Sequence, residues 1–266
     1  LSPDDKPLEK MCIGILGFGR FGQFLASKIN KLHTIIATSR KDYSEQAKNL
    51  GINFYYNMKE FFEQSDVIII SVSISSFNEV IQSIPKEYFK NKLIVDVLSV
   101  KELPKNILTS FNFEYDFDIL CTHPMFGPES GDKSWNDLYF VYEKVKINNI
   151  QRCQSFLNIF KEEGCKMVEM NCQKHDNIGS DSQFITHLIG RLLKKLNVKE
   201  LEINTTGYQA LIDIMNNTCN DSDELFKGIY QQNKKSAYTL DILKSSLDSI
   251  ISDLNPTFKN RDHFRK

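Results

Sequence analysis

Met-Cys-Ile-Gly-Ile-Leu-Gly-Phe-Gly-Arg-Phe-Gly, residues 11–22, is the stretch of this sequence that decides the fold. An apolar run is followed by Gly17, Gly19 and Gly22 at the G-x-G-x-x-G spacing, and then by an amphipathic stretch. The first glycine permits a tight turn, the second lets a pyrophosphate approach the backbone, and the third lets a helix pack on the strand. The helix also offers free N–H groups to the phosphates; a purely structural turn is the alternative. The predicted dinucleotide site comprises Gly17, Phe18, Gly19, Arg20, Phe21 and Gly22.

The first part of the chain alternates short apolar runs with amphipathic stretches. This alternation predicts an α/β fold in which helices cover both faces of a doubly wound parallel sheet of the Rossmann type. Helices are expected over Phe21–Leu32 and Ser44–Leu50, among others. Two further runs, Tyr139–Ile147 and Cys165–Met170, are expected to add strands at the edge of the sheet. The principal strands are expected over Met11–Leu16, His33–Ser39, Asp66–Ser73, Lys92–Leu98 and Asp118–Thr122.

After about Asn171 the strand pattern stops, and apolar residues recur at helical spacing. We therefore divide the chain into a dinucleotide-binding domain, residues 1–171, and an all-α domain, residues 172–266. So few residues form a thin core, and we expect the helices to pack on the first domain or on a second copy of the chain. The amphipathic helices are expected within Asp176–Leu196, Gly207–Asn217 and Asp223–Leu254.

The composition argues against several classes of partner. The 266 residues include 33 Lys and Arg against 34 Asp and Glu, for a formal net charge of −1. Nucleic-acid binders need a basic surplus to displace counterions, so we expect no nucleic-acid partner. The apolar run around Val67–Ile70 is far too short to span a bilayer, and we expect no membrane association. The six cysteines lack the paired spacing of a metal site, so we expect a reduced compartment and no metal.

The end of the second predicted strand bears on the choice between NAD and NADP. An Asp or Glu about twenty residues past the glycines would bind the ribose 2′-hydroxyl and select NAD. The sequence instead has Ser39, Arg40 and Lys41, and a hydroxyl with two cations suits a 2′-phosphate. We therefore predict NADP as the cofactor. A solvated basic loop is the alternative, and the nearby Asp42 keeps NAD open.

Polar residues follow three predicted strands, at the edge where parallel sheets bind ligands. They are Ser73, which we assign to the cofactor site, Ser99 and His123. Imidazole titrates near neutrality and can accept a proton from a substrate hydroxyl. From composition alone, a structural histidine held by the turn at Pro124 explains His123 equally well.

A polar stripe interrupts the first apolar helix after Asn171. Gln183, His187 and Arg191 are four residues apart, so they share a helical face that could line a cleft between domains. A solvated face is the alternative. His175 and Asp176 are expected to begin this helix, with Asp176 as its N-cap.

Several segments together resemble the arogenate/prephenate dehydrogenase family, most closely its plant-type arogenate dehydrogenases. The resemblance extends from about Met11 to Leu254, and the block around His123 is its most specific part. The segments are Gly-Phe-Gly-Arg-Phe-Gly-Gln-Phe-Leu-Ala (17–26), Val-Asp-Val-Leu-Ser-Val-Lys-Glu (95–102), Asp-Ile-Leu-Cys-Thr-His-Pro-Met-Phe-Gly-Pro-Glu-Ser-Gly (118–131), Glu-Gly-Cys-Lys-Met-Val-Glu-Met (163–170), Ser-Gln-Phe-Ile-Thr-His (182–187) and Asn-Thr-Cys-Asn-Asp-Ser (217–222).

The resemblance implies an NADP-dependent oxidative decarboxylation of a cyclohexadienol in tyrosine biosynthesis. His123 would be the catalytic histidine that accepts the 4-hydroxyl proton, and Ser99 would bond the reacting hydroxyl and orient that histidine. Gln183 and His187 would line the substrate pocket. The substrate is arogenate, which gives tyrosine, or alternatively prephenate, which gives 4-hydroxyphenylpyruvate. The resemblance also implies a homodimer formed through the helical domain.

The choice of substrate depends on its side-chain end, which is an ammonium in arogenate and a keto group in prephenate. In the plant-type family an acidic residue at the position of Asp221 favours arogenate, because a carboxylate pairs with an ammonium. The alternative is that Asp221 caps the following helix together with Glu224. The two carboxylates of the substrate need donors, for which Arg191 and Ser130 are candidates.

The sequence departs from the family's usual pattern at several places. Arg20 replaces a common Asn in the glycine turn and can add a phosphate contact. The other departures are Asp132–Ser134, Asn177–Asp181 and Thr206.

Two rival functions stay open at this point. A β-hydroxyacid dehydrogenase would need a catalytic lysine on the first long helix of the second domain, but Lys174 precedes that helix without a matching motif. A catalytically silent protein that only senses NADP would not need Ser99, His123, Gln183 and His187 together. The chain opens on Leu1 rather than Met, so an upstream segment is expected; by resemblance the location is the plastid stroma, with the cytosol as alternative.

Overall fold

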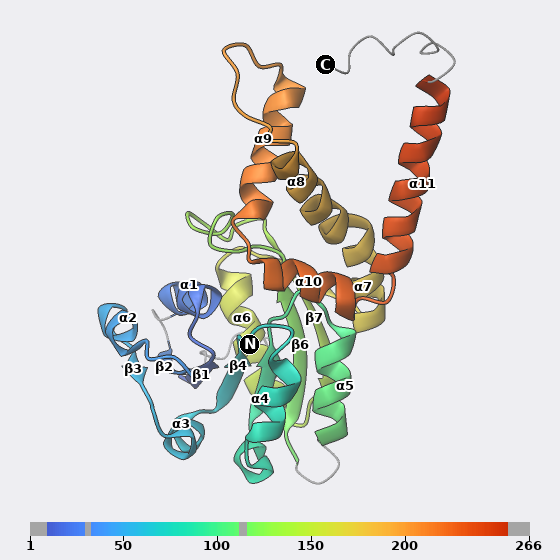
Figure 1. Ribbon diagram of the computed structural model, residues 1–266. Coiled ribbons are helices and arrows are strands. Elements are labelled where there is room, and N and C mark those ends of the chain that lie inside the picture. The colour runs from blue at the N-terminus through green and yellow to red at the C-terminus, as the bar shows by residue number, and fades with distance from the viewer. Residues whose placement is uncertain (1–9, 30–32, 112–115, 255–266) are drawn as a thin grey trace, which may run out of the picture.

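The computed structural model describes residues 10–29, 33–111 and 116–254, and its N-terminal part is built on one eight-stranded sheet (Figure 1). The strand order is β3-β2-β1-β4-β5-β6-β7-β8, in which the first six are parallel, β7 is antiparallel to β6, and β8 is parallel to β7. This order is that of a doubly wound sheet, so the predicted fold is confirmed. The strands are β1 (Cys12–Leu16), β2 (Thr34–Thr38), β3 (Asn53–Phe54), β4 (Val67–Ile70), β5 (Leu93–Asp96), β6 (Asp118–Pro124), β7 (Tyr139–Lys146) and β8 (Lys166–Glu169).

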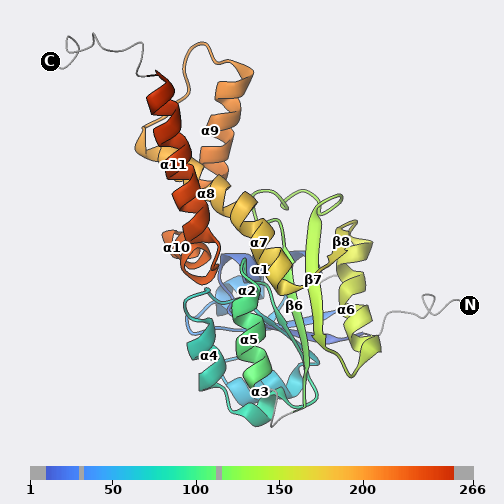
Figure 2. The same cartoon turned by 90° about the vertical axis from the view of Figure 1, so that its right-hand side faces the viewer.

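Helices cover both faces of the sheet (Figure 2). On one face, Phe24 of α1 and Phe156 of α6 join a core that continues into the stacked rings of Trp135 and Phe160. On the other face, α3, α4 and α5 pack a second apolar core on the sheet. The strands are apolar on both sides because they are buried on both sides. These helices are α1 (Arg20–Ile29), α2 (Ser44–Asn49), α3 (Met58–Gln64), α4 (Phe77–Ser83), α5 (Glu102–Phe111) and α6 (Ile150–Glu162), with a 3₁₀ turn at Lys86–Phe89.

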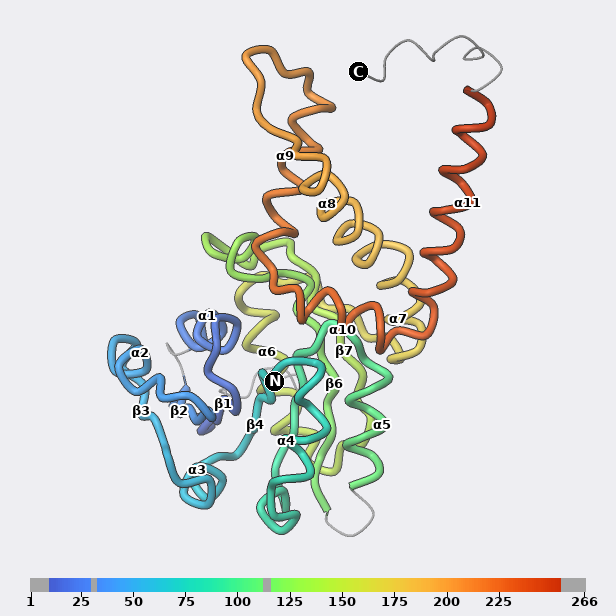
Figure 3. The backbone as a smooth tube through the Cα atoms, viewed as in Figure 1, coloured from blue at the N-terminus to red at the C-terminus, as the bar shows by residue number. Residues whose placement is uncertain are grey.

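Every described element after β8 is helical. A π-helical turn, Ser180–Phe184, separates the first two helices, and α11 projects from the end of α10 away from the sheet (Figure 3). None of the helices in the described ranges is long and apolar enough to cross a membrane. The helices are α7 (Cys172–Gly179), α8 (Ile185–Lys195), α9 (Thr206–Cys219), α10 (Asp223–Gln232) and α11 (Ser236–Leu254).

Several details differ from the sequence-based expectations. Asp176 is not an N-cap, because α7 begins earlier and Asn171 caps it by accepting from the backbone N–H of Lys174. The helix expected over Asp176–Leu196 is interrupted by the π-helical turn. The helical stretch after Asp223 breaks at Asn233, whose side-chain amide donates to the carbonyl of Asp176. The last three residues of the helix expected over Phe21–Leu32 lie outside the described residues.

Candidate active site

The glycine turn has the geometry of a phosphate cradle. Gly17 has φ +96°, and a Cβ there would lie 2.4 Å from the carbonyl oxygen of Ser71. A Cβ at Gly22 would lie 2.4 Å from the carbonyl oxygen of Gly17, so α1 packs directly on the turn. A Cβ at Gly19, by contrast, would meet no atom within 4 Å. The middle glycine therefore leaves open backbone beside the start of α1, where a pyrophosphate fits.

The loop after β2 presents cations at the same edge of the sheet. Arg40 and Lys41 are exposed and Ser39 is half-buried. Asp42 faces its own loop, because its carboxylate accepts from the backbone N–H of Ser44 at 2.8 Å and from the Tyr56 hydroxyl at 3.1 Å. These bonds, chiefly those from Ser44, lower the pKa of Asp42. Asp42, the acidic residue that left NAD as an alternative cofactor, is thus already hydrogen-bonded within the protein.

The loop after β4 contacts α10 at the same edge of the sheet as the glycine turn. Ser73 Oγ lies 2.7 Å from the hydroxyl of Ser76, and Glu224, in the first turn of α10, accepts a hydrogen bond from Ser75. A Cβ at Gly228 of α10 would lie 3.0 Å from Ile74, so helix and loop are in close contact. The edge of the sheet therefore faces α10.

His123 lies in β6 and heads a chain of three buried polar side chains. Its Nδ1 lies 2.8 Å from Nε2 of His175. His175 Nδ1 in turn lies 2.9 Å from the Asp176 carboxylate. That carboxylate also accepts the backbone N–H groups of Lys101, at 2.8 Å, and Glu102, at 2.9 Å, where α5 begins.

These contacts fix which nitrogen of His123 can accept a proton. The Asp176 carboxylate only accepts, so His175 donates to it from Nδ1 and, when neutral, accepts at Nε2. His123 therefore carries its hydrogen on Nδ1, which leaves its Nε2 lone pair as the acceptor. This is the orientation that a general base requires.

A buried ion pair lies beneath His123. Lys101 donates through Nζ to the Asp96 carboxylate and to the carbonyl of Thr122, which anchors the backbone immediately before His123. Burial, the neighbouring His175 and the charge of Lys101 hold the pKa of His123 well below its usual value of 6.5. His123 is consequently neutral at physiological pH and able to take up a proton.

Ser99 follows β5 at the same edge of the sheet and is half-buried. The Nδ1 atom of His123 bonds to His175 and not to Ser99. The side chain that orients the histidine in this structure is therefore His175. The catalytic assignment of Ser99 stays a prediction.

The polar stripe beyond Asn171 includes two buried groups. Gln183 lies in the π-helical turn, and its Oε1 is a buried acceptor with no hydrogen-bond partner in the described part of the chain. His187 is buried, and its Nε2 lies 3.7 Å from the Asp221 carboxylate. Burial and then Arg191 lower the pKa of His187 to about 4, so this imidazole is neutral. The buried Oε1 of Gln183 is available to accept a hydrogen bond from a donor group of a bound ligand.

Arg191 and Ser130 are both engaged within the protein. The guanidinium of Arg191 donates to the carbonyls of Thr218 and Ser222, each at 3.2 Å, and lies 4.4 Å over the ring of Phe226. Arg191 therefore satisfies backbone carbonyl groups at the end of α9 and in the connection that follows it. Ser130 is exposed and accepts from the backbone N–H of Gly127 at 3.1 Å. Their assignments to the substrate carboxylates stay predictions.

Asp221 lies in the connection between α9 and α10 and is free of a capping role. The N-cap of α10 is Ser222, whose hydroxyl accepts from the backbone N–H of Leu225 at 3.1 Å. The capping explanation for Asp221 is therefore wrong. Burial and then the charge of Glu129 raise the pKa of Asp221, while Arg20 and Arg191 counteract this.

Sequence reasoning missed three members of the site: His175, Asp176 and Lys101. The adjacent His-Asp pair and the Lys that closes Val-Asp-Val-Leu-Ser-Val-Lys were the available signals. Neither signal predicts the contacts with β6, because His123 lies 52 positions from His175 and Thr122 lies 21 positions from Lys101.

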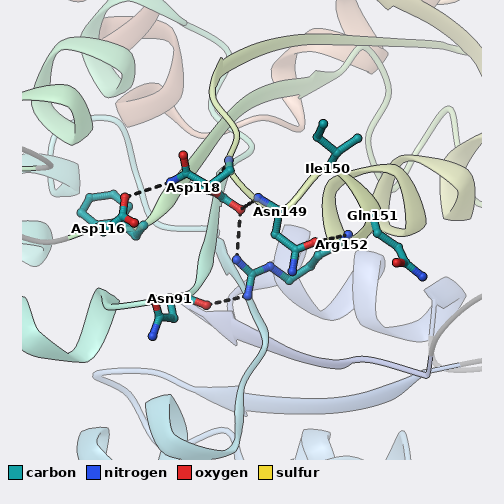
Figure 4. Close-up of a pocket in the computed structure, with 9 residues that line it drawn as sticks. Asn91, Asp116, Asp118, Asn149, Ile150, Gln151 and Arg152 are labelled. Atoms are coloured by element: carbon teal, nitrogen blue, oxygen red, sulfur yellow. Dashed lines mark hydrogen bonds and ion pairs between the residues drawn. The ribbon is translucent and has the colours of Figure 1, made fainter.

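A cavity in the sheet region is separate from the site around His123 (Figure 4). It has a volume of about 600 Å³ and lies at the start of β6, whereas His123 is near the end of that strand. Its polar groups bond one another, as in the ion pair of Arg152 with Asp118 at 3.0 Å. In residues 10–29, 33–111 and 116–254, no cluster of three or more His, Cys, Asp or Glu could hold a metal.

Comparisons with known families match both parts of the chain. Residues 12–100 match the family described as NADP oxidoreductase coenzyme F420-dependent, and residues 192–265 match the TYRAAT1-like C-terminal domain. Among solved structures, a prephenate dehydrogenase from A. aeolicus in complex with hydroxyphenyl propionate and NAD+ shares the fold, with a TM-score of 0.72 over 96% of this chain and 94% of that one, at 16% identity. Arogenate dehydrogenase from Synechocystis gives a TM-score of 0.63 over 93% of each chain, at 14% identity.

Two curated relatives from Arabidopsis thaliana are much closer in sequence. Arogenate dehydrogenase 1, chloroplastic, is 45% identical over 92% of this chain, which spans 39% of that relative's length. Arogenate dehydrogenase 2, chloroplastic, is 46% identical over 91% of this chain, which spans 69% of that relative's length. The resemblance noted in the sequence is thereby confirmed, and the chain belongs to the arogenate dehydrogenase family.

Proposed function

We propose that this chain catalyses the NADP-dependent oxidative decarboxylation of L-arogenate to L-tyrosine. The observation that carries the proposal is the buried His123, whose Nδ1 is held by His175 and whose Nε2 is left as a proton acceptor. It lies at the carboxyl edge of the sheet, which also bears the open glycine turn. A base at the same edge of the sheet as a dinucleotide cradle suits the oxidation of an alcohol.

The protein's part in the reaction is proton acceptance and orientation. His123 takes the proton of the 4-hydroxyl through Nε2, and the resulting imidazolium is stabilised through His175 by the Asp176 carboxylate. When bound, the oxidised nicotinamide accepts the hydride that leaves the carbon bearing this hydroxyl. The ring carboxylate departs as CO₂ and its bonding electrons enter the ring, which becomes an aromatic phenolate. His123 then returns the proton to that oxygen to give the phenol of tyrosine. Ser99 is proposed to bond the reacting hydroxyl, and Gln183 to bind the substrate through its unpartnered oxygen.

NADP is the proposed cofactor. The cations Arg40 and Lys41 suit a 2′-phosphate, and Asp42 is turned toward Ser44 and Tyr56. A Schizosaccharomyces pombe relative, 25% identical, is described as a probable prephenate dehydrogenase [NADP(+)]. Gly17, Gly19, Gly22, Arg20 and Ser73 are proposed to complete the site.

Arogenate is preferred over prephenate in this proposal because of Asp221. Its carboxylate is partly buried beside His187 and has no capping role, so it can pair with the ammonium of arogenate. A keto acid offers it no comparable partner. Prephenate is the alternative substrate, and the Asp221→Asn variant tests the choice: we expect it to lose the preference for arogenate.

A homodimer through the helical part, residues 172–266, completes the proposal, with residues 1–171 as the NADP-binding part. Apolar side chains at the end of α8 and on α11 are exposed, including Leu196 at 65%, just after α8, and Leu247 at 55%, and a second copy would cover them. The plastid stroma is the proposed location, because the Arabidopsis relatives are chloroplastic; a fluorescent fusion of the full-length protein checks this against the cytosol.

The test is NADPH formation with arogenate and with prephenate, each against NADP+ and NAD+. We expect arogenate with NADP+ to be the preferred pair. His123→Asn should lower kcat by about 10²–10⁴-fold while NADPH affinity is kept, because only the proton acceptor is removed. Silence with all four pairs in protein that binds NADPH would instead identify a cofactor sensor.

A further inference from the structure

Arg20 joins three segments that are far apart in the chain. It is the first residue of α1, immediately after Gly19 of the glycine turn. Its guanidinium forms an ion pair with Glu129, in the loop that follows His123. The same group donates to the carbonyl of Asn220 at 3.5 Å, one residue before Asp221. The side chain thus contacts the loop after β6 and the α9–α10 connection at once.

Arg20 also carries a positive charge between two acidic residues, Glu129 and Asp221. The Asn220 carbonyl that Arg20 contacts immediately precedes Asp221, and the charge of Glu129 adds to burial in raising the pKa of Asp221. Arg20 and Arg191 are the cations that oppose this effect. Arg191 is tied to backbone carbonyls at the end of α9, whereas the side chain of Arg20 is 59% exposed. Arg20 is therefore the cation that can leave.

A pyrophosphate on the glycine turn competes with Glu129 for this guanidinium. Phosphate oxygens accept bidentate, charge-assisted hydrogen bonds from arginine, and Arg20 is placed between Gly19 and Gly22, where they would lie. Once Arg20 turns to the phosphate, Glu129 and Asp221 are left with an excess of negative charge. An ammonium group is the partner that restores the balance.

We propose that Arg20 couples dinucleotide binding to recognition of the substrate's ammonium group by Glu129 and Asp221. This inference rests on the proposed function and names Glu129 as a second specificity residue. Bound NADPH tightens a ligand that carries an ammonium and leaves unchanged the same ligand without it. By thermodynamic linkage the ammonium ligand tightens NADPH by the same factor.

The experiment measures binding and not turnover. L-Tyrosine and 3-(4-hydroxyphenyl)propionate differ by the ammonium group, and their Kd values are measured by titration calorimetry with and without saturating NADPH. The reciprocal measurement uses energy transfer to NADPH from Trp135, the single tryptophan of the chain. We expect NADPH to tighten tyrosine by about 5–150-fold and the propionate by less than about twofold.

Two variants separate the partners of the ion pair. Arg20→Gln should weaken NADPH and abolish its effect on tyrosine, because the phosphate contact and the switch are both lost. Glu129→Gln should tighten NADPH in the absence of tyrosine, since the competitor for Arg20 is removed. Lys28→Gln is the matched control: Lys28 is also on α1 and donates to the carbonyl of Asp132 in the same loop, but it lies two turns away from the glycines.

Equal effects of NADPH on both ligands, or an unchanged effect in Arg20→Gln, would overturn the inference. Arogenate turnover is measured on the same preparations. A protein that oxidises arogenate without this coupling refutes the role of Arg20 alone, whereas a protein without arogenate turnover refutes the proposed function.

Discussion

At the scale of single residues, the proposed chemistry depends on three side chains that specify one tautomer of His123. Asp176 accepts two backbone N–H groups and the Nδ1 hydrogen of His175, and each is a donor that an amide NH₂ cannot receive. Asp176→Asn therefore turns its NH₂ against at least one of these donors and removes the negative charge that would stabilise the imidazolium of His123 through His175. We expect kcat to fall by about 10²–10⁴-fold with little change in NADPH affinity.

The pH profile and a neighbouring variant complete this test. Because the pKa of His123 is depressed, its neutral form persists below pH 6.5, and the acid limb of kcat/KM in the parent should lie below that value. Asp181→Asn removes an exposed carboxylate that pairs with Lys235, and it should leave both kcat and the profile unchanged. An acid limb above pH 6.5 would contradict a histidine that burial keeps neutral.

His123 could be proposed as the base from the sequence, but the residues that orient it, His175 and Asp176, could not. Its place after an apolar strand and its family motif identify it without any knowledge of contacts. His175 and Asp176 resemble an ordinary helix start, and their role arises only because α7 packs beside β6. Capping preferences depend only on residues close together in the chain. They therefore cannot predict the contact between His123 and His175, which are 52 positions apart.

At the scale of secondary-structure elements, helical periodicity predicted the helices well and their interruptions poorly. The apolar spacing runs through residues 176–196 as if the helix were continuous, yet the π-helical turn interrupts it at Ser180–Phe184. A wide turn of this kind is decided by what packs around it; Ser180, for example, bonds Thr239 of α11 at 2.7 Å. Gln183 belongs to this turn, so its exact position was not available from spacing alone.

The contact between α8 and α9 depends on a glycine. A Cβ at Gly190 would lie 1.9 Å from the hydroxyl oxygen of Thr218 and 3.2 Å from the carbonyl of Ile214. Gly190→Ala should therefore force the two helices apart and lower the free energy of unfolding by about 1–3 kcal/mol in urea denaturation.

A second glycine provides the control for this substitution. A Cβ at Gly207, in the first turn of α9, would meet no atom within 4 Å. Gly207→Ala should leave stability unchanged or raise it by up to about 1 kcal/mol, because alanine favours the helix. Equal destabilisation by both substitutions would show that helix packing at Gly190 is not the cause.

At the scale of the whole molecule, the sequence predicts that the helical part has too small a core to be stable by itself. Its helices are therefore expected to pack on the first domain or on a second copy of the chain. In the structure α11 projects from α10 (Figure 3), and its Leu247, Ile250 and Leu254 are all more than half exposed. Which surface covers them cannot be read from one chain, because the pairing geometry belongs to the assembly.

Light scattering during gel filtration tests the proposed dimer. Leu247→Glu should convert a dimer of the 30.8 kDa chain to a monomer, because it places a charge in the apolar face of α11. Ser249 is two residues further along and faces about 200° away on the helix, so Ser249→Glu is the control and should stay dimeric. A parent protein that is monomeric at all concentrations would refute the dimer.

The chain of contacts from His123 to Asp176 crosses from the sheet to the first helix beyond it. During synthesis the ribosome delivers the glycine turn and β6 well before α7. A nascent chain that has reached residue 171 contains the proton acceptor but neither of the groups that fix its tautomer. Such an unfinished chain carries His123 without a fixed tautomer, and His123 acquires one only after α7 has been synthesised and has packed beside β6.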